Sequence, residues 1–254
     1  MTTQEFSIEF DILYNNLASN SAPPINEYEK SVLLTKAQSD IVLELYSGRN
    51  QLGLSFESNE EVRRYLLPLI RYYDRTEGIA MTYDSLYDCY KCYIYRPVDS
   101  EDAWNALRPG LATIKEELHG TTSNNTEVNI PIVPVTYDDL DKVLRNPFKR
   151  PKGLKRALRL DSNQAERNNA SKVNGSTTII YTEDQIQGLT YREWYLAKPT
   201  PIILPDIDDS TLTIDGESVK STKECSLSPI LHNMILERAV LLAKQAYIGG
   251  QTQA

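Results

Sequence analysis

Apolar residues recur with the period of a helix near the start of the chain. Within residues 5–19 they follow at spacings of four, three and four and share one helix face: Phe6, Phe10, Leu13 and Leu17. Residues 25–50 predict a longer helix, because Asn26 and Glu29 form a capping pair and Gly48 is a typical stop. The buried face of this helix is predicted to begin at Val32 or Leu33 and to continue with Ala37, Ile41 and Leu45.

Two further stretches show the helical period. Residues 58–74 begin with a Ser58–Glu61 capping pair and keep the period to Tyr73, but Pro68 removes a backbone donor and predicts a kink or an end. Near the C-terminus, Ser228 is the expected cap and Pro229 the first helical residue. The buried face of this last helix is predicted to contain Leu231, Ile235, Ala239, Leu242 and Ala246.

The middle of the chain alternates instead, which favours strands. Four stretches combine alternation with aromatic or β-branched residues: 86–98, 155–160, 177–182 and 189–196. Residues 136–146 predict a short helix capped by Thr136, while the proline-rich stretches 130–135 and 198–205 are predicted to be extended. Residues 99–129 are mixed, with a possible short helix around Trp104 and then a polar loop, and residues 161–176 predict a long exposed hairpin loop.

These elements indicate an α+β fold. The expected architecture is a helical bundle, formed by the N-terminal helices and the C-terminal helix, with a β-rich region inserted in it. Residues 1–85 and 226–254 would form the discontinuous helical core, and residues 86–225 the β-rich projecting region.

Charge is distributed unevenly along the chain. The 254 residues carry a formal net charge of −8, yet residues 145–159 contain seven Lys or Arg and no acidic residue. The rest of the chain therefore has 20 basic and 35 acidic residues, a net charge of −15. The seven basic residues are the candidate interaction residues: Arg145, Lys149, Arg150, Lys152, Lys155, Arg156 and Arg159.

Three interpretations of this basic segment are open: a solvated strand edge, a contact with phosphate, or a contact with an acidic protein surface. Pro147, Pro151 and Gly153 break its first half, and its second half can form a strand with Lys155, Ala157 and Arg159 on one face. A proline-broken arm suits a neighbouring protein surface better than a DNA groove. The 16 Tyr against 4 Phe allow either interface Tyr or half-buried Tyr in the β-rich region.

Catalytic chemistry has little support in the sequence. Cys89 and Cys92 have C-x-x-C spacing but lie in an alternating strand, where positions three apart point to opposite faces. The two histidines, His119 and His232, have no nucleophile pattern around them, and no phosphate-binding glycine motif is present. We therefore expect no enzyme, no metal and no cofactor. No apolar run of 18 residues exists, so we expect no membrane span.

Four stretches together resemble a known family. Residues 13–48 (LYNNLASNSAPPINEYEKSVLLTKAQSDIVLELYSG) are similar to the opening helices of phage head–tail adaptor proteins. Residues 130–151 (IPIVPVTYDDLDKVLRNPFKRP) and 195–204 (YLAKPTPIIL) resemble segments of ring proteins of crAss-like short-tailed phages. Residues 227–244 (LSPILHNMILERAVLLAK) resemble their closing helix. These stretches cover about half the chain, in the family's order.

The resemblance implies a structural virion protein, made in the host cytoplasm and placed at the portal vertex and tail. Such adaptors form a ring, commonly twelve-fold, that docks under the portal, extends the DNA channel and offers the attachment surface for the next tail ring. The implied partners are other copies of the chain, the portal, neighbouring tail rings and packaged DNA that passes without sequence-specific binding. Two rivals remain: a nucleic-acid-binding module using residues 145–159, and a small cytoplasmic regulator with a helical partner-binding face.

Overall fold

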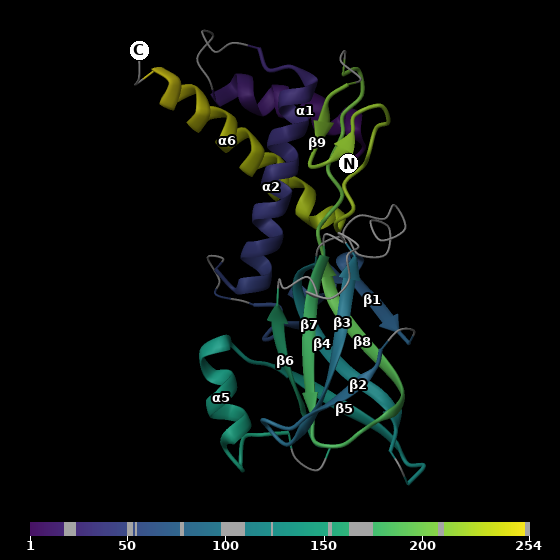
Figure 1. Cartoon of the computed structure of the whole chain (residues 1–254). Helices are drawn as coiled ribbons and strands as arrows, with labels where there is room; N and C mark the ends of the chain where they lie inside the picture. Colours follow the sequence, from purple (N-terminus) through teal and green to yellow (C-terminus); the bar gives the residue numbers. More distant parts are fainter. Residues whose placement is uncertain are drawn as a thin grey trace. The chain divides into compact units, whose positions relative to one another are not determined.

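The computed structural model describes ten stretches of the chain, namely residues 1–17, 24–49, 53, 55–76, 79–97, 110–122, 124–151, 154–162, 175–207 and 211–251. Two compact units share it: a helical unit of Met1–Ile70 with Lys198–Ala254, and a β unit of Arg71–Ala197 (Figure 1). The α+β class expected from the sequence is confirmed. The unit borders lie earlier than the expected borders after residues 85 and 225, because strand β1 (Ile70–Arg75) follows the helical turn that ends at Leu69, and strand β8 (Gln187–Ala197) ends at Ala197.

Three longer helices form the body of the helical unit. In Figure 1, α6 crosses α2, and α1 packs beside α6. A shorter helix and two 3-10 turns complete the unit, with a small β hairpin. The bounds are α1 (Thr3–Leu17), α2 (Glu27–Ser47), α3 (Glu60–Leu66), η1 (Leu67–Leu69), β9 (Thr213–Ile214), β10 (Glu217–Ser218), η2 (Pro229–Leu231) and α6 (His232–Gln251).

Local signals at both ends of α2 act as the sequence predicts. The Asn26 side chain accepts a 2.8 Å hydrogen bond from the Glu29 amide, and the Glu29 carboxylate accepts one of 3.1 Å from the Asn26 amide. Gly48 ends the helix in the left-handed region, with φ 72°. Along the helix, Ala37, Ile41 and Leu45 are buried.

Several other residues that were predicted on the buried faces of α2 and α6 are not buried. Leu33 is only half-buried and Val32 is 39% exposed, because Leu34 points into the core instead. Leu231, in the turn η2, and Ile235, on α6, are buried, but Leu242 is half-buried and Ala246 is exposed. Ala239 is buried as expected, and the helical period of 3.6 residues also brings Leu236, Val240 and Ala243 inward.

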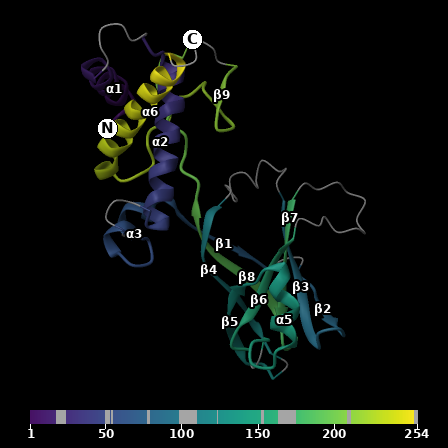
Figure 2. The same ribbon diagram turned by 90° about the vertical axis from the view of Figure 1, so that its left-hand side faces the viewer.

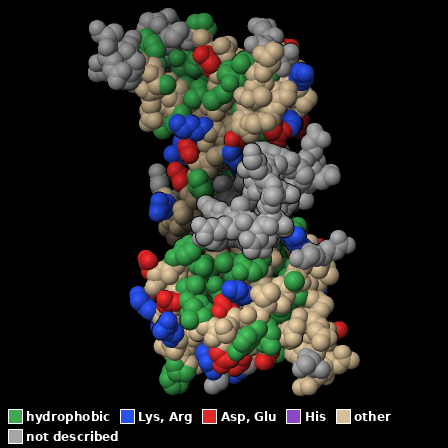
Figure 3. Space-filling view, viewed as in Figure 1, with side chains coloured by type: hydrophobic (Ala, Val, Ile, Leu, Met, Phe, Trp, Pro, Cys, Tyr) green, Lys and Arg blue, Asp and Glu red, His purple; other side chains and the backbone are tan. Residues whose placement is uncertain are grey.

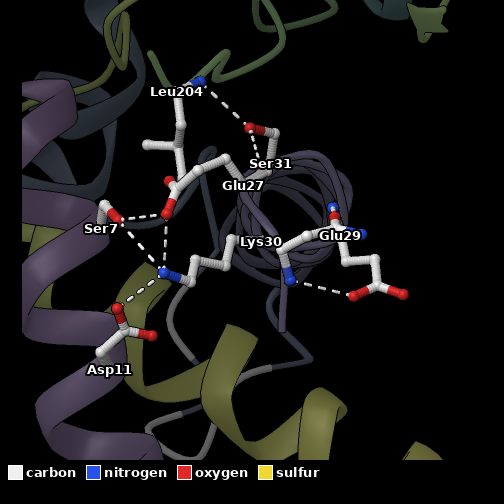
Figure 4. A network of polar contacts seen from close by, with 8 residues as sticks. Ser7, Asp11, Glu27, Glu29, Lys30, Ser31 and Leu204 are labelled. Carbon is white, nitrogen blue, oxygen red and sulfur yellow. Dashed lines mark hydrogen bonds and ion pairs between the residues drawn. The ribbon is translucent and has the colours of Figure 1, made fainter. Parts of the chain in front are cut away.

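A buried lysine joins α1 to α2. Lys30 is 3% exposed, and its ammonium group lies 2.7 Å from an Asp11 carboxylate oxygen and 2.8 Å from one of Glu27 (Figure 4). It also donates a 3.2 Å hydrogen bond to the Ser7 hydroxyl. Burial lowers the pKa of Lys30, but the bonds to Asp11 and Glu27 outweigh burial and raise the pKa above its usual value. The charge therefore stays on the buried amine and fixes the two helices together.

A second polar stripe of α2 binds the backbone of residues 200–204. The Ser31 hydroxyl accepts a 3.0 Å hydrogen bond from the Leu204 amide, and the Thr35 hydroxyl accepts one of 3.1 Å from the Ile202 amide. One turn further on, the Gln38 side chain donates a 2.8 Å bond to the Thr200 carbonyl. All three side chains are buried and replace the neighbouring strand that an extended segment otherwise needs.

Proline and a β bridge complete the hydrogen bonding of this segment. Pro199 and Pro201 are buried but have no amide hydrogen to satisfy. Between the two amides bound by α2, Ile203 exchanges two 3.0 Å backbone bonds with Lys223. A segment as apolar as PIIL can therefore be buried with the amides of residues 202–204 paired.

The β unit contains an eight-stranded curled sheet in the order β1-β8-β4-β5-β6-β7-β3-β2 (Figures 1 and 2). Adjacent strands with a described register are antiparallel, except β5 and β6, which are parallel. Parallel neighbours need a crossover, and α5 (Tyr137–Arg145) provides it. The strands are β1 (Ile70–Arg75), β2 (Met81–Asp84), β3 (Cys89–Pro97), β4 (Gly110–Thr121), β5 (Glu127–Pro134), β6 (Ala157–Ser162), β7 (Gly175–Thr182) and β8 (Gln187–Ala197).

Each face of the curled sheet has its own apolar cluster. The inner cluster comes from β3, β4, β5, β6, β7 and β8 and includes Cys92, Ile94, Leu118, Ile130, Ala157, Ile180 and Tyr191. The outer cluster lies beneath α5, whose Leu140 and Leu144 pack with Leu158, Leu160, Tyr181 and Cys89. Strand β6 contributes to both clusters, so both of its faces are covered.

The strands predicted from alternation are present, but three elements differ from the expectation. Of the two outcomes predicted at Pro68, a kink or an end, the structure shows an end: the 3-10 turn Leu67–Leu69 leads into β1, so Tyr73 lies in a strand and not on a helix face. Gly110–Thr121 form the long strand β4 within residues 99–129, whose pattern is mixed, and Met81–Asp84 form β2, where no element was predicted. The α3 cap is Asn59 rather than Ser58. The Trp104 helix and residues 163–174 of the predicted loop lie outside the described residues.

At two predicted helix starts, the capping residue is in place but its side chain makes no capping hydrogen bond. Thr136 and Ser228 occupy the predicted N-cap positions, but neither side chain accepts a bond from the first turn of its helix. Pro229 opens a 3-10 turn, and α6 begins only at His232. Among the described residues, no helix has both the length and the apolar character needed to cross a membrane.

Replacing Thr35 by valine tests the backbone-binding stripe of α2. The variant keeps most of the side-chain volume but leaves the Ile202 amide buried without its partner, so the free energy of unfolding should fall by about 1–3 kcal/mol. Urea unfolding followed by helical circular dichroism measures the change. The control is Lys36→Ala on the adjacent exposed position, which should stay within about 0.5 kcal/mol of the parent. Equal effects of the two variants would contradict the importance of this bond.

Candidate interaction surface

The basic segment 145–159 is divided between a helix end, a turn and a strand. Arg145 is the last residue of α5 and is exposed, as are Lys149 in the turn and Lys155 before β6. Arg150 is half-buried, and its Nε atom has no hydrogen-bond partner among the residues that the structure describes. Lys152 lies outside the described residues.

Arg159 belongs to the interior of the β unit. It forms an ion pair with Glu116 of β4, and the two side chains are 13% and 3% exposed. A second carboxylate, that of Asp161, lies 3.3 Å away. Burial disfavours the charged guanidinium, but the bond to Glu116 and both carboxylates outweigh burial and raise the pKa of Arg159. Arg159 is therefore committed to its own chain, unlike the exposed cations of the segment.

The same polar cluster extends to β8. The Tyr191 hydroxyl donates to Glu116 and lies 3.3 Å from Glu193, whose other oxygen accepts a 3.0 Å bond from Thr113. Tyr191, Glu116 and Glu193 are all buried. Nothing in the basic segment indicated these partners, because they lie on strands distant in the sequence and the register of β4 decides which glutamate points inward.

Lys155, Ala157 and Arg159 do not form the shared strand face that the sequence predicts. Ala157 is buried in the inner cluster, while Lys155 precedes β6 and is exposed. A solvated strand edge does not describe β6 either, because it lies between β5 and β7.

A hydrogen-bonded turn follows α5. The Lys149 and Arg150 amides both donate to the Asn146 carbonyl, at 3.1 and 2.9 Å. The Asn146 side chain accepts a 2.9 Å bond from the Phe148 amide, and Arg156 donates a 2.9 Å bond to the Phe148 carbonyl. Arg156 thus acts within its own chain, where it stabilises the turn.

Phe148 is the residue of this surface that sequence reasoning missed. Its side chain is 90% exposed, although a phenyl ring normally lies in the core. The available signal was a phenylalanine between Pro147 and Lys149, in a turn too short to bury it. We call residues 145–149 with Lys155 the basic turn, which presents one aromatic ring among exposed cations.

Other exposed apolar residues accompany the basic turn in the β unit. The space-filling view shows hydrophobic side chains gathered over the strands that face the viewer, with Lys, Arg, Asp and Glu among them (Figure 3). Exposed residues of the unit include Tyr83, Leu86 and Tyr137. The tyrosines of the β unit fall into two groups, because Tyr181, Tyr191 and Tyr195 are buried whereas Tyr72, Tyr83 and Tyr137 are about half exposed or more. Interface use of the exposed group stays a prediction.

The cysteines do not form a shared site. Cys89 belongs to the outer cluster and Cys92 to the inner one, so the two thiols point to opposite faces of β3, as expected. Burial raises the pKa to about 11 for Cys89, about 12 for Cys92 and about 11 for Cys225. No group of three potential metal-binding side chains occurs among the residues that the structure describes.

His232 has a packing role. Its ring lies 5.3 Å from the Phe6 ring and its Nε2 atom is 3.3 Å from the Leu227 carbonyl. Burial lowers the pKa of His232, and the nearby N-terminal amino group lowers it further. His119 is half-buried, and its Nδ1 atom lies 2.7 Å from the Asn129 side-chain oxygen.

The helical unit contains an open groove of about 470 Å³ between the end of α1, the start of α2 and the end of α6. Its walls are mainly apolar or aromatic, with Tyr14, Tyr28 and Tyr247 among them, and Glu29 is the one charged residue among the described residues of its lining. Ala246, expected in the core, lines this groove. We call it the N-terminal groove.

Comparison with known proteins covers the whole chain. The family model "Phage tail ring protein 3/4" matches residues 1–254. The chain is similar to "Ring protein 3" of Bacteroides phage crAss001, with 36% identity over 248 residues, 96% of this chain and 95% of that protein. It is also similar to "Ring protein 4/5" of the same phage, with 31% identity over 253 residues, 98% of this chain and 94% of that protein.

The different roles of Arg159 and Lys149 give a paired prediction. Arg159→Met leaves the buried Glu116 carboxylate without its cation, so the free energy of unfolding should fall by about 3–5 kcal/mol. Lys149→Met removes an exposed charge and should change it by no more than about 0.5 kcal/mol. Chemical denaturation followed by tyrosine and tryptophan fluorescence compares the two. A stable Arg159→Met protein would show that the ion pair does not hold the β unit together.

Proposed function

Because this chain belongs to the phage tail ring protein 3/4 family and is thus a structural component of the virion tail, we propose that it forms one ring of the head–tail connector. In this proposal the ring docks under the portal, extends the DNA channel and offers the attachment surface for the next ring. The main support is the family match over all 254 residues, since the matched region contains both units and the basic turn. As in the sequence-based expectation, the ring is twelve-fold.

The two crAss001 proteins support an arrangement of related rings. Both align with nearly the whole of this chain, at 36% and 31% identity, so one phage contains two ring proteins related to it. Chains related over their full length can share a two-unit architecture and stack as successive rings. Self-association within a ring and contact with a neighbouring tail ring are the two interactions this requires.

The net negative charge of the chain supports a channel through which DNA passes without being bound. Outside residues 145–159 the net charge is −15, which repels phosphate. Of the seven cations in the segment, Arg159 is paired inside the β unit and Arg156 supports the turn. Arg145, Lys149 and Lys155 remain exposed, and we assign them to protein contact rather than DNA contact.

The weakness of exposed ion pairs favours assembly of the ring on a partner ring that has already formed. Exposed ion pairs contribute only about 0–1 kcal/mol each, so a ring held partly by them gains stability from repetition and from a preformed partner ring. We therefore expect the purified chain to be a monomer or small oligomer, and to form rings on the portal or on an adjacent ring.

Depletion of this chain during infection tests the proposed position. An amber mutation in its coding sequence, grown without a suppressor, should yield DNA-filled heads whose tails lack this ring and every component attached beyond it. Electron microscopy and protein composition of the purified particles measure the outcome. Particles grown on a suppressor strain are the control. Complete tails in the depleted particles would contradict the proposal.

Neutralising the exposed cations separates the connector from the nucleic-acid-binding alternative. The triple variant Arg145→Gln, Lys149→Gln and Lys155→Gln should reduce incorporation into tails on the order of tenfold, because three weak pairs are lost per subunit. The residual assembly should also be less sensitive to salt. A matched control replaces three exposed cations outside the segment: Arg64, Lys142 and Lys220. Normal incorporation together with loss of duplex-DNA binding would favour the alternative.

A further inference from the structure

Phe148 is presented outward by a turn that is already formed. Four hydrogen bonds of 2.9–3.1 Å hold residues 146–150, and two of them fix the amide and the carbonyl of Phe148 itself. The ring is nevertheless 90% exposed. A preformed turn loses little conformational freedom on binding, so an aromatic ring in this position suits insertion into a pocket.

The N-terminal groove has the size and lining to accept such a ring. A cavity of about 150 Å³ is sufficient for benzene in an apolar site. The groove measures about 470 Å³, and Tyr14, Tyr28 and Tyr247 provide aromatic partners along with the aliphatic side chains of Ile25 and Leu33.

The charges around the two surfaces are opposite. The basic turn carries exposed Arg145 and Lys149, and no acidic residue occurs in residues 145–159. By contrast, Glu29 is the charged residue among the described residues that line the groove, and none of these lining residues is Lys or Arg.

We propose that the basic turn of one subunit inserts Phe148 into the N-terminal groove of the next copy of this chain in the ring. A ring is built from head-to-tail contacts, which need two different matching surfaces on every subunit. The turn and the groove are such a pair, since one lies in the β unit and the other in the helical unit. Lys149 then lies near the Glu29 rim. This inference rests on the proposed ring assembly.

Cross-linking in assembled tails tests the contact while Phe148 is retained. Cysteine replaces exposed Lys149 and exposed Ala246 in the same chain, and purified tails are treated with a short bismaleimide. The native thiols should not react with the maleimide, since burial raises the pKa of each to about 11 or 12. Each doubly substituted subunit links to two neighbours, so denaturing gels should show a ladder of dimers, trimers and larger products.

The controls distinguish this contact from other arrangements. Lys149→Cys alone and Ala246→Cys alone should yield no chain-to-chain product. Leu86→Cys with Ala246→Cys pairs the groove with another exposed position of the β unit, 69% exposed as leucine, and should also yield none. Dimers from Lys149→Cys alone, an equal ladder from the Leu86 pair, products only with another tail protein, or no product in tails that contain the chain would each overturn the inference.

Two measurements separate this inference from the proposed function. Protein composition of the tails reports whether the chain is incorporated at all, so its absence from parent tails would refute both. Presence in the tails without the ladder refutes only the turn-in-groove contact. Phe148→Ala provides a second readout and should lower incorporation at least tenfold, while Leu86→Ala leaves it unchanged; normal incorporation of Phe148→Ala would also overturn the inference.

Discussion

The architecture depends on the bonds between one face of α2 and the extended backbone of residues 200–204. Ser31, Thr35 and Gln38 supply the partners that a neighbouring strand would otherwise provide, in a region closed to water. Through this contact the chain, on leaving β8, is fixed to a helix that lies about 170 residues earlier. α6 can then pack on α2 and α1, and the β unit becomes an insertion whose two connections end in one helical unit.

This organisation separates rigid parts from surfaces available for contact. In the β unit, the Arg159–Glu116 ion pair and the two apolar clusters of the sheet occupy the interior. The basic turn projects from the end of the crossover helix α5, where a change of side chain disturbs little of the core. In the helical unit, Lys30 joins α1 to α2 from within, and the N-terminal groove is open to solvent between the end of α1, the start of α2 and the end of α6. A ring subunit needs both a stable body and two distinct contact surfaces.

Sequence patterns predicted what depends on neighbours in the chain. The capping box of Asn26 and Glu29, the stop at Gly48 and the strands β3, β7 and β8 follow from local spacing. The burial of Arg159 could not be predicted this way, because it depends on Glu116 reaching the same interior from β4. Ala246 and Leu242 were misplaced for a related reason: the alanine-rich end of α6 allows several stripes, and packing against α2 selects one.

Hydrogen–deuterium exchange of the free chain and of assembled tails tests the central claim most directly. The account predicts that amides of residues 145–149, at the start of α2 and at the end of α6 are slower to exchange in tails than in the free protein. Amides of β6 should be slow in both states, because that strand is internal. Unchanged exchange at the basic turn, or new protection confined to surfaces outside the turn and the groove, would contradict it.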